Sequence, residues 1–188
     1  MSKPTHLRAD AARNRERLIA AAREQFSSGD KTVSLEGVAQ AADVGIATLY
    51  RHFPTREALV EAVYRSELDA LAADAEDLLH DYMAFDALRM WMDRYVRFVV
   101  TKHAMYDALR MALASRTGPA PETRARIRAS VAKFLAAGAS DGTIRDDVEA
   151  DDVTLSLAAM VVATMTSTDQ NQLRRLLDLL MDALRPPH

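Results

Sequence analysis

The chain of 188 residues contains no cysteine. It therefore has no disulfide framework, no cysteine-ligated metal site and no thiol nucleophile. Six glycines and six prolines are too few for a loop-rich or collagen-like chain. No uncharged apolar stretch approaches the roughly 18 residues of a membrane-spanning helix, and the polar stretch 1–8 lacks the apolar segment of a signal peptide. The expected location is the cytoplasm.

Helix-forming residues dominate what is present. Alanine is the commonest residue, leucine follows, and 49% of the chain is hydrophobic. Apolar residues recur at intervals of three and four, whereas strand-like alternation is almost nowhere visible. The sequence predicts an all-α fold of about nine helices, with a core large enough to need no disulfide or structural metal.

The spacing and the capping residues place these helices. Ser34 and Thr55 are predicted N-caps, Asp151 or Asp152 is another, and Ser140-Asp141-Gly142 is a predicted turn after the seventh helix. The breaker-rich stretch 115–121 is the clearest loop. The helices are predicted over about 10–27, 35–42, 46–53, 56–82, 88–99, 105–113, 127–135, 152–168 and 173–184.

Charge is distributed unevenly along the chain. The formal net charge is -3, but residues 1–31 carry seven basic and four acidic side chains, which is +3 and leaves -6 for the rest. Such asymmetry is typical of a polyanion-binding module attached to an acidic body. Ordinary charge on solvated helix surfaces would give the same count, and both interpretations stay open at this point.

Residues 34–53 have the pattern of a helix-turn-helix, in which two short helices flank a turn that contains glycine. At about 100° per residue, Leu49 and Phe53 face the core of the second helix. The side chains on its outer face and edges are Ala47, Thr48, Tyr50, Arg51 and His52.

This outer face suits the major groove of DNA, which is wide enough to admit an α-helix. The small side chains of Ala47 and Thr48 permit close approach, and Arg51 can donate two hydrogen bonds to guanine. Tyr50 and His52 can reach phosphates, as can the helix N-terminus capped by Ser34. Similar spacing also occurs in helical proteins that bind no DNA, and Tyr50 could equally pack at the edge of the core.

The stretch 38–60, with its Thr-Leu-Tyr-Arg-His-Phe-Pro run at 48–54, closely resembles the N-terminal region of TetR/AcrR-type transcriptional regulators. Residues 17–22 with Phe26 and Gly29 also match the first helix of that family, so the resemblance covers about 10–63. It implies that Thr48 and Arg51 face bases, and that Tyr50, His52 and Arg56 contact the DNA backbone.

Two positions depart from the family pattern. The turn reads Asp43-Val44-Gly45 instead of the commoner Gly-Val-Ser type, which puts the path of its backbone in doubt. Glu36 stands where many relatives place a residue able to approach DNA. Its carboxylate could repel phosphate or accept from cytosine, but complementing the helix dipole is the favoured interpretation.

The resemblance also implies a division into a DNA-binding domain at 1–60 and a helical ligand-binding and dimerisation domain at 61–188. Methionines and aromatic residues cluster between 83 and 111, a composition that suits an adaptable apolar pocket. The same stripe is expected more often in an ordinary core, and a lone histidine is more often exposed or satisfied. The predicted ligand-binding residues are Trp91, Tyr95, His103, Met111 and Phe134.

The last two predicted helices offer apolar surface for a four-helix dimer interface, although a core within one chain would explain the same residues. A two-fold dimer would bind a palindromic operator. The predicted interface residues are Leu155, Val162, Met165, Leu173, Leu176, Leu177, Leu180 and Leu184.

The sequence thus predicts a ligand-responsive, homodimeric repressor that binds operator DNA and is released by a small apolar or amphipathic effector. The alternative is a helical small-molecule-binding protein or enzyme without a role at DNA. The five histidines form no metal-binding pair at helical spacing, and no Gly-rich phosphate loop is present. No catalytic residue, metal or cofactor is predicted.

Overall fold

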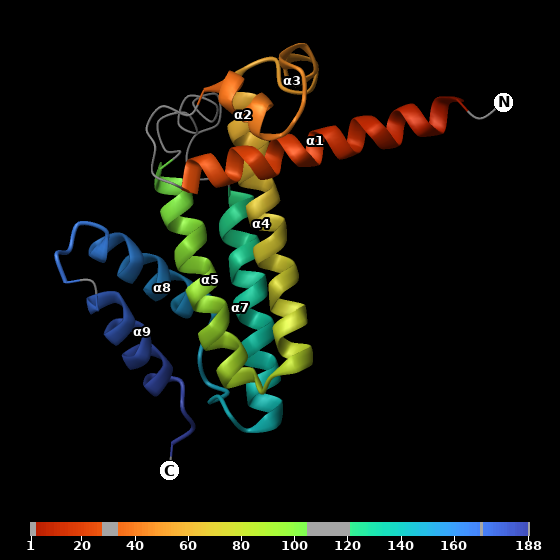
Figure 1. The fold of residues 1–188 in the computed structure, drawn as a ribbon. Helices are drawn as coiled ribbons and strands as arrows, with labels where there is room; N and C mark the ends of the chain where they lie inside the picture. Colours follow the sequence, from red (N-terminus) through yellow and green to blue (C-terminus); the bar gives the residue numbers. More distant parts are fainter. Residues whose placement is uncertain (1–2, 28–33, 105–120, 170, 188) are drawn as a thin grey trace. The chain divides into compact units, whose positions relative to one another are not determined.

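The structure is a computed structural model that describes residues 3–27, 34–104, 121–169 and 171–187. These residues form eight α-helices and no strand, which confirms the predicted all-α fold (Figure 1). No helix in these ranges is long and apolar enough to cross a membrane. The helices are α1 (Lys3–Ser27), α2 (Leu35–Ala41), α3 (Ile46–His52), α4 (Arg56–Asp81), α5 (Ala84–Ala104), α7 (Pro121–Asp141), α8 (Ala150–Thr164) and α9 (Gln172–Ala183).

Several helix boundaries differ from the prediction, and α5 and α7 extend past both ends of the predicted ranges 88–99 and 127–135. Helix α1 begins at Lys3 and not near Asp10, because a proline such as Pro4 is tolerated in the first helical turn. Helix α8 ends at Thr164 and begins at Ala150, so both aspartates predicted as caps lie in its first turn, where they complement the dipole. The predicted helix 105–113 and most of the predicted loop 115–121 lie outside the described residues.

The chain divides into two compact units, and the first contains α1, α2 and α3. Its limits are Met1–Glu67 together with Val100–Thr117. Helix α1 packs against α2 and α3 through its C-terminal half, where Leu18, Ala22 and Phe26 are buried. Before Leu18 every described side chain of α1 is exposed or only half-buried, so one half of this helix holds the unit together.

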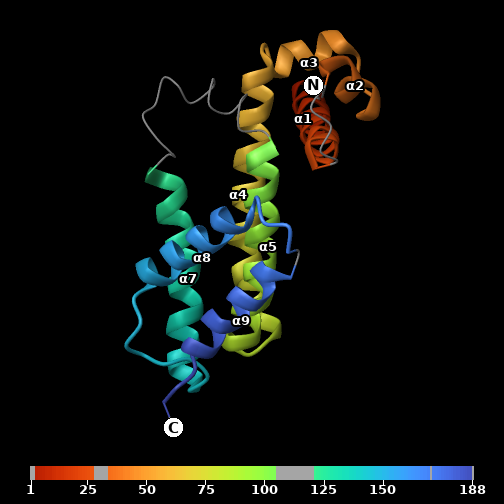
Figure 2. The same ribbon diagram turned by 90° about the vertical axis from the view of Figure 1, so that its left-hand side faces the viewer.

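The second unit contains residues Leu68–Val99 and Gly118–His188. In its core, the indole Nε1 of Trp91 on α5 donates to the backbone oxygen of Leu71 on α4 at 2.9 Å. Phe134 of α7 packs on Trp91 with 5.7 Å between ring centroids. Helix α8 packs on α7, and α9 packs on α8, so that α8 and α9 lie together on one side of this unit (Figure 2).

The turn after α7 forms where the sequence predicts it. Gly142 has a φ of +72°, a left-handed conformation that favours glycine. Asp141 accepts hydrogen bonds from the Thr143 amide at 2.9 Å and from the Ala84 amide at the start of α5. Ile144 then lies so close to Gly138 that a side chain there would meet it at 2.5 Å.

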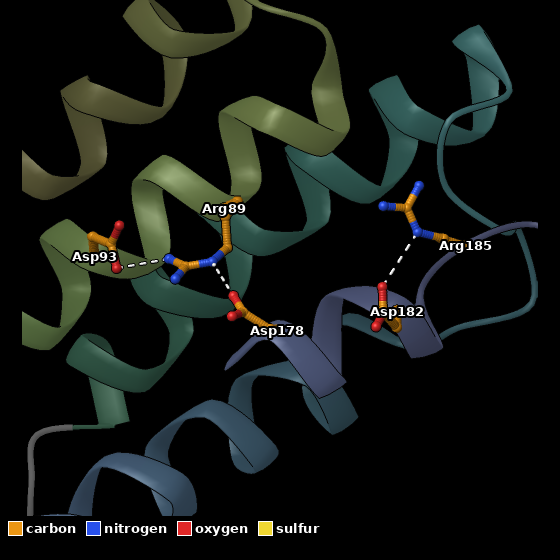
Figure 3. A network of polar contacts seen from close by, with 5 residues as sticks. All are labelled: Arg89, Asp93, Asp178, Asp182 and Arg185. Atoms are coloured by element: carbon orange, nitrogen blue, oxygen red, sulfur yellow. Dashed lines mark hydrogen bonds and ion pairs between the residues drawn. The ribbon is translucent and has the colours of Figure 1, made fainter. Parts of the chain in front are cut away.

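Arg89 of α5 and Asp178 of α9 connect these two helices (Figure 3). The Arg89 guanidinium donates to Asp178 at 3.2 Å and to Asp93 at 2.7 Å. Partial burial acts to lower the pKa of Arg89, but the two carboxylates outweigh it and raise that pKa above its ordinary value. Arg185, just after α9, lies 4.4 Å from the centre of the Phe85 ring. Two contacts by arginine therefore hold α9 against α5.

Candidate nucleic-acid interface

The first short helix of the helix-turn-helix begins at the predicted cap. Ser34 has extended backbone (φ -93°, ψ 146°), and its hydroxyl oxygen accepts from the Gly37 amide at 2.9 Å. This bond satisfies one of the amides that a helix start leaves unpaired. Glu36 is exposed in the first turn of α2, where its charge complements the helix dipole.

The turn between α2 and α3 has a defined backbone path despite its unusual sequence. Asp43 adopts the left-handed conformation, with a φ of +50°, which aspartate tolerates better than most residues. The Val44 amide donates back to the Ala39 oxygen at 2.9 Å and closes the turn. Gly45 is the N-cap of α3 and supplies no side-chain hydrogen bond. Aspartate therefore takes the strained position, and glycine stands where a serine could have capped α3.

Helix α3 has one buried side and one exposed side. Leu49 is fully buried, as is Phe53 directly after the helix. On the other side Ala47 and Arg51 are exposed and Thr48 is half-buried. Tyr50 is 46% exposed, and Arg51 has no ion-pair partner among the described residues. The outer face is therefore polar, cationic and available to a partner.

His52, at the end of α3, is half-buried. Its Nε2 atom is shielded from solvent and has no hydrogen-bond partner in the part of the chain that the structure describes. Burial lowers the pKa of His52, and the charges of Arg51 and Arg15 lower it further. The ring must therefore turn before Nε2 can reach a phosphate.

Helix α4 also begins as predicted. The Thr55 hydroxyl oxygen accepts from the Ala58 amide at 3.1 Å. Arg56, the first residue of α4, is exposed, so its side chain is available for the backbone contact that the family resemblance implies.

The residues predicted to bind a ligand lie in the core of the second unit where the structure describes them. Trp91 and Phe134 are fully buried and Tyr95 nearly so. Trp91 stacks on Tyr95 with 5.8 Å between ring centroids. Met111 and the side chain of His103 lie outside the described residues.

The residues predicted for the dimer interface fall into three groups. Leu155 and Val162 on α8 are strongly exposed, at 57% and 63%. Leu177 and Leu184 are buried within their own chain. The half-buried residues are Met165, Leu173, Leu176 and Leu180.

Sequence reasoning missed Leu179, which is 64% exposed on α9. Its signal was available: this leucine lies off the main apolar stripe of an amphipathic helix. Such a residue is exposed unless a partner covers it.

Comparison with known proteins identifies the family to which the chain belongs. The fold and the two short helices α2 and α3 define an all-helical protein with a helix-turn-helix. Residues 18–63 match the tetR family of bacterial regulatory proteins, and residues 83–186 match the C-terminal domain of SbtR-like transcriptional regulators. The chain belongs to the TetR family and is a DNA-binding transcriptional regulator, not an enzyme.

Solved structures and curated relatives agree with this assignment. The TetR transcriptional regulator SCO0520 from Streptomyces coelicolor is 38% identical, with a TM-score of 0.82 over 93% of this chain and 99% of its own. A TetR transcription regulatory protein from Mycobacterium vanbaalenii is 31% identical, with a TM-score of 0.74 over 96% and 99%. An HTH-type transcriptional regulator from Staphylococcus aureus is 26% identical over 105 residues, which are 55% of this chain and 57% of that relative.

Proposed function

We propose that the protein is a homodimeric repressor that binds a palindromic operator in the cytoplasm and leaves it when a small apolar or amphipathic effector binds. The exposed face of α3, with Arg51 at its centre and Leu49 fixing it from behind, is the observation that supports reading of the major groove.

The residue roles can be tested by binding assays. The operator is recovered by selecting randomised duplexes with the full chain. Arg51→Ala should then cost about 1–3 kcal/mol and relax specificity at one base pair in each half-site, because arginine reads guanine directly. Arg56→Ala should weaken operator and random duplexes alike, because a phosphate contact carries no sequence information. Equal loss of specificity in both variants would contradict these roles.

The proposed dimer uses the apolar surface of α8 and α9. Leu155 and Val162 are exposed on α8, Leu179 is exposed on α9, and the two helices pack on each other. In the proposed dimer these side chains are covered by a second copy of the chain around a two-fold axis. The double variant Val162→Glu/Leu179→Glu should dissociate in sedimentation experiments while each chain stays folded. The matched control is Tyr82→Glu/Met83→Glu, which changes two residues of 48% and 55% exposure outside α8 and α9. If both double variants remain dimeric, α8 and α9 are not the interface.

The proposed effector site comprises Trp91, Tyr95, His103, Met111 and Phe134. The packed rings of the three described members support it as an apolar site, which must open to admit a ligand. A thermal-shift screen should find a molecule that adds about 2.7 kcal/mol of stability at 100 times its Kd. The effector must also bind the free form more tightly than the DNA-bound form, so the same molecule should weaken operator binding. Hits that stabilise the protein without releasing DNA would contradict ligand-induced release.

A further inference from the structure

The N-terminal half of α1, residues 3–17, buries none of the side chains that the structure describes there, which are those of residues 9–17. Its described side chains are exposed or half-buried, whereas Leu18 onward packs against α2 and α3. Leu7 is the one leucine, isoleucine, valine or large aromatic residue in the stretch. Figure 1 shows this half of α1 running on past α2 and α3. At 1.5 Å per residue it extends about 22 Å beyond Leu18.

This half is also the most basic part of the helix. It carries five basic residues against two acidic ones. Arg13 and Arg17 lie on the solvent side, with side chains 60% and 50% exposed. Arg13 pairs with Asp10 within its own helix, and such an exposed pair is screened by water and readily exchanged for a phosphate.

Two contacts fix this half beside the helix-turn-helix. The Nη1 atom of Arg17 lies 3.8 Å from Oδ2 of Asp43, in the turn between α2 and α3. The Arg15 guanidinium lies 5.4 Å from the centre of the Phe53 ring, directly after α3. The basic stretch therefore lies next to the helix-turn-helix whose second helix is proposed to read DNA.

From this geometry we infer that residues 3–17 of α1 form an arm that binds DNA backbone phosphates beyond the groove segment occupied by α3. The inference rests on the proposed DNA-reading role of α3 and adds a second, sequence-independent contact region. Arg8 and Arg13 are the two arginines of the arm that lie farthest from Leu18 in the sequence. Arg15 and Arg17 contact the helix-turn-helix and hold the arm in place.

The test compares two double variants of the full chain. Arg8→Gln/Arg13→Gln removes two charges from the arm and keeps good helix formers. Arg97→Gln/Arg128→Gln removes the same charge from exposed positions on α5 and α7 and is the matched control. Affinities for the selected operator and for a random duplex of equal length are measured between 50 and 200 mM salt. Ethylation interference then maps the contacted phosphates.

We expect the arm variant to bind operator and random duplex more weakly by the same factor. Its salt dependence should fall by about 0.9 in log–log slope for each lost contact. Over the fourfold salt range, two lost contacts make the wild-type affinity fall about tenfold more than that of the variant. Interference should disappear at phosphates separate from the base pair that depends on Arg51, and the control variant should keep the wild-type slope.

Three outcomes would overturn the proposal that the arm binds DNA. They are an unchanged salt slope in Arg8→Gln/Arg13→Gln, an equal change of slope in the control variant, or a loss by the arm variant of its preference for operator over random duplex. A shifted monomer–dimer equilibrium with intact DNA binding would assign the arm to a second copy of the chain and also overturn it. If the wild-type chain selects no operator at all, the proposed function fails, which is a different result from wild-type binding that is insensitive to the arm.

Discussion

Helices α3 and α5 differ in how many of their side chains are buried. Of the seven residues of α3, Leu49 alone is buried. Among the described side chains of α5, seven are buried, namely Ala84, Ala87, Leu88, Trp91, Met92, Tyr95 and Phe98. Helix α3 is anchored by buried Leu49 and presents polar groups, whereas α5 is held by its aromatic core. The difference teaches that a helix proposed to bind a partner keeps most of its side chains exposed, whereas a core helix buries one whole side.

The largest expected effect breaks the core of the second unit. Phe134→Ala removes a fully buried ring and should cost about 3–5 kcal/mol of unfolding free energy, measured by urea denaturation. The operator preference of the molecules that remain folded should not change, because Phe134 lies outside the unit that contains α3.

The control for Phe134→Ala is Met83→Ala, at a position that is 55% exposed. It should change stability by less than about 0.5 kcal/mol. A change in sequence preference on Phe134→Ala would show that recognition and core packing are not separable in this protein.

The features that the sequence predicts well are local ones. The caps at Ser34 and Thr55 follow from hydroxyl side chains that reach amides three residues ahead. The inward direction of Leu49 follows from helical periodicity. Each depends on residues within one or two turns, so short-range patterns suffice.

The features that could not be predicted depend on contacts distant in sequence or on strain. Periodicity alone does not say that Leu177 is buried while Leu180 on the same helix is only half-buried, because burial depends on which helix covers each side chain. The approach of Ile144 to Gly138 arises only when the chain turns back after α7. The left-handed Asp43 lies where glycine is the usual choice, and no periodicity marks it.

An intermediate effect tests whether the first unit depends on its caps. Ser34→Ala should cost about 1 kcal/mol of stability, because the Gly37 amide loses its acceptor. Ser34→Asp keeps an oxygen acceptor and should retain that stability, but its charge should repel phosphate and weaken DNA binding. Denaturation and binding titrations on both variants separate the two roles of this position. If Ser34→Asp binds DNA as tightly as the wild type, the start of α2 does not approach the backbone.

The smallest expected effect is a pH dependence of stability caused by His52, which lies at the edge of the core and beside the proposed DNA interface. Burial, Arg51 and Arg15 lower its pKa in the folded chain below the ordinary value of about 6.5. Between these two pKa values the unfolded chain binds more protons, so the contribution of His52 to stability is complete above pH 6.5 and is lost as the pH falls below it. His52→Gln should remove this part of the acid sensitivity in denaturation experiments at pH 5.5 and 7.5.

The affinity for DNA should change with pH in the opposite direction if His52 contacts the DNA backbone. A nearby phosphate favours the protonated imidazole, so wild-type affinity for the operator should rise from pH 7.5 to pH 6, and the rise should be absent in His52→Gln. Acid-sensitive stability combined with pH-independent affinity would instead assign His52 to the edge of the core. Phosphate contact at the end of α3 would then fall to Tyr50, whose side chain is already exposed.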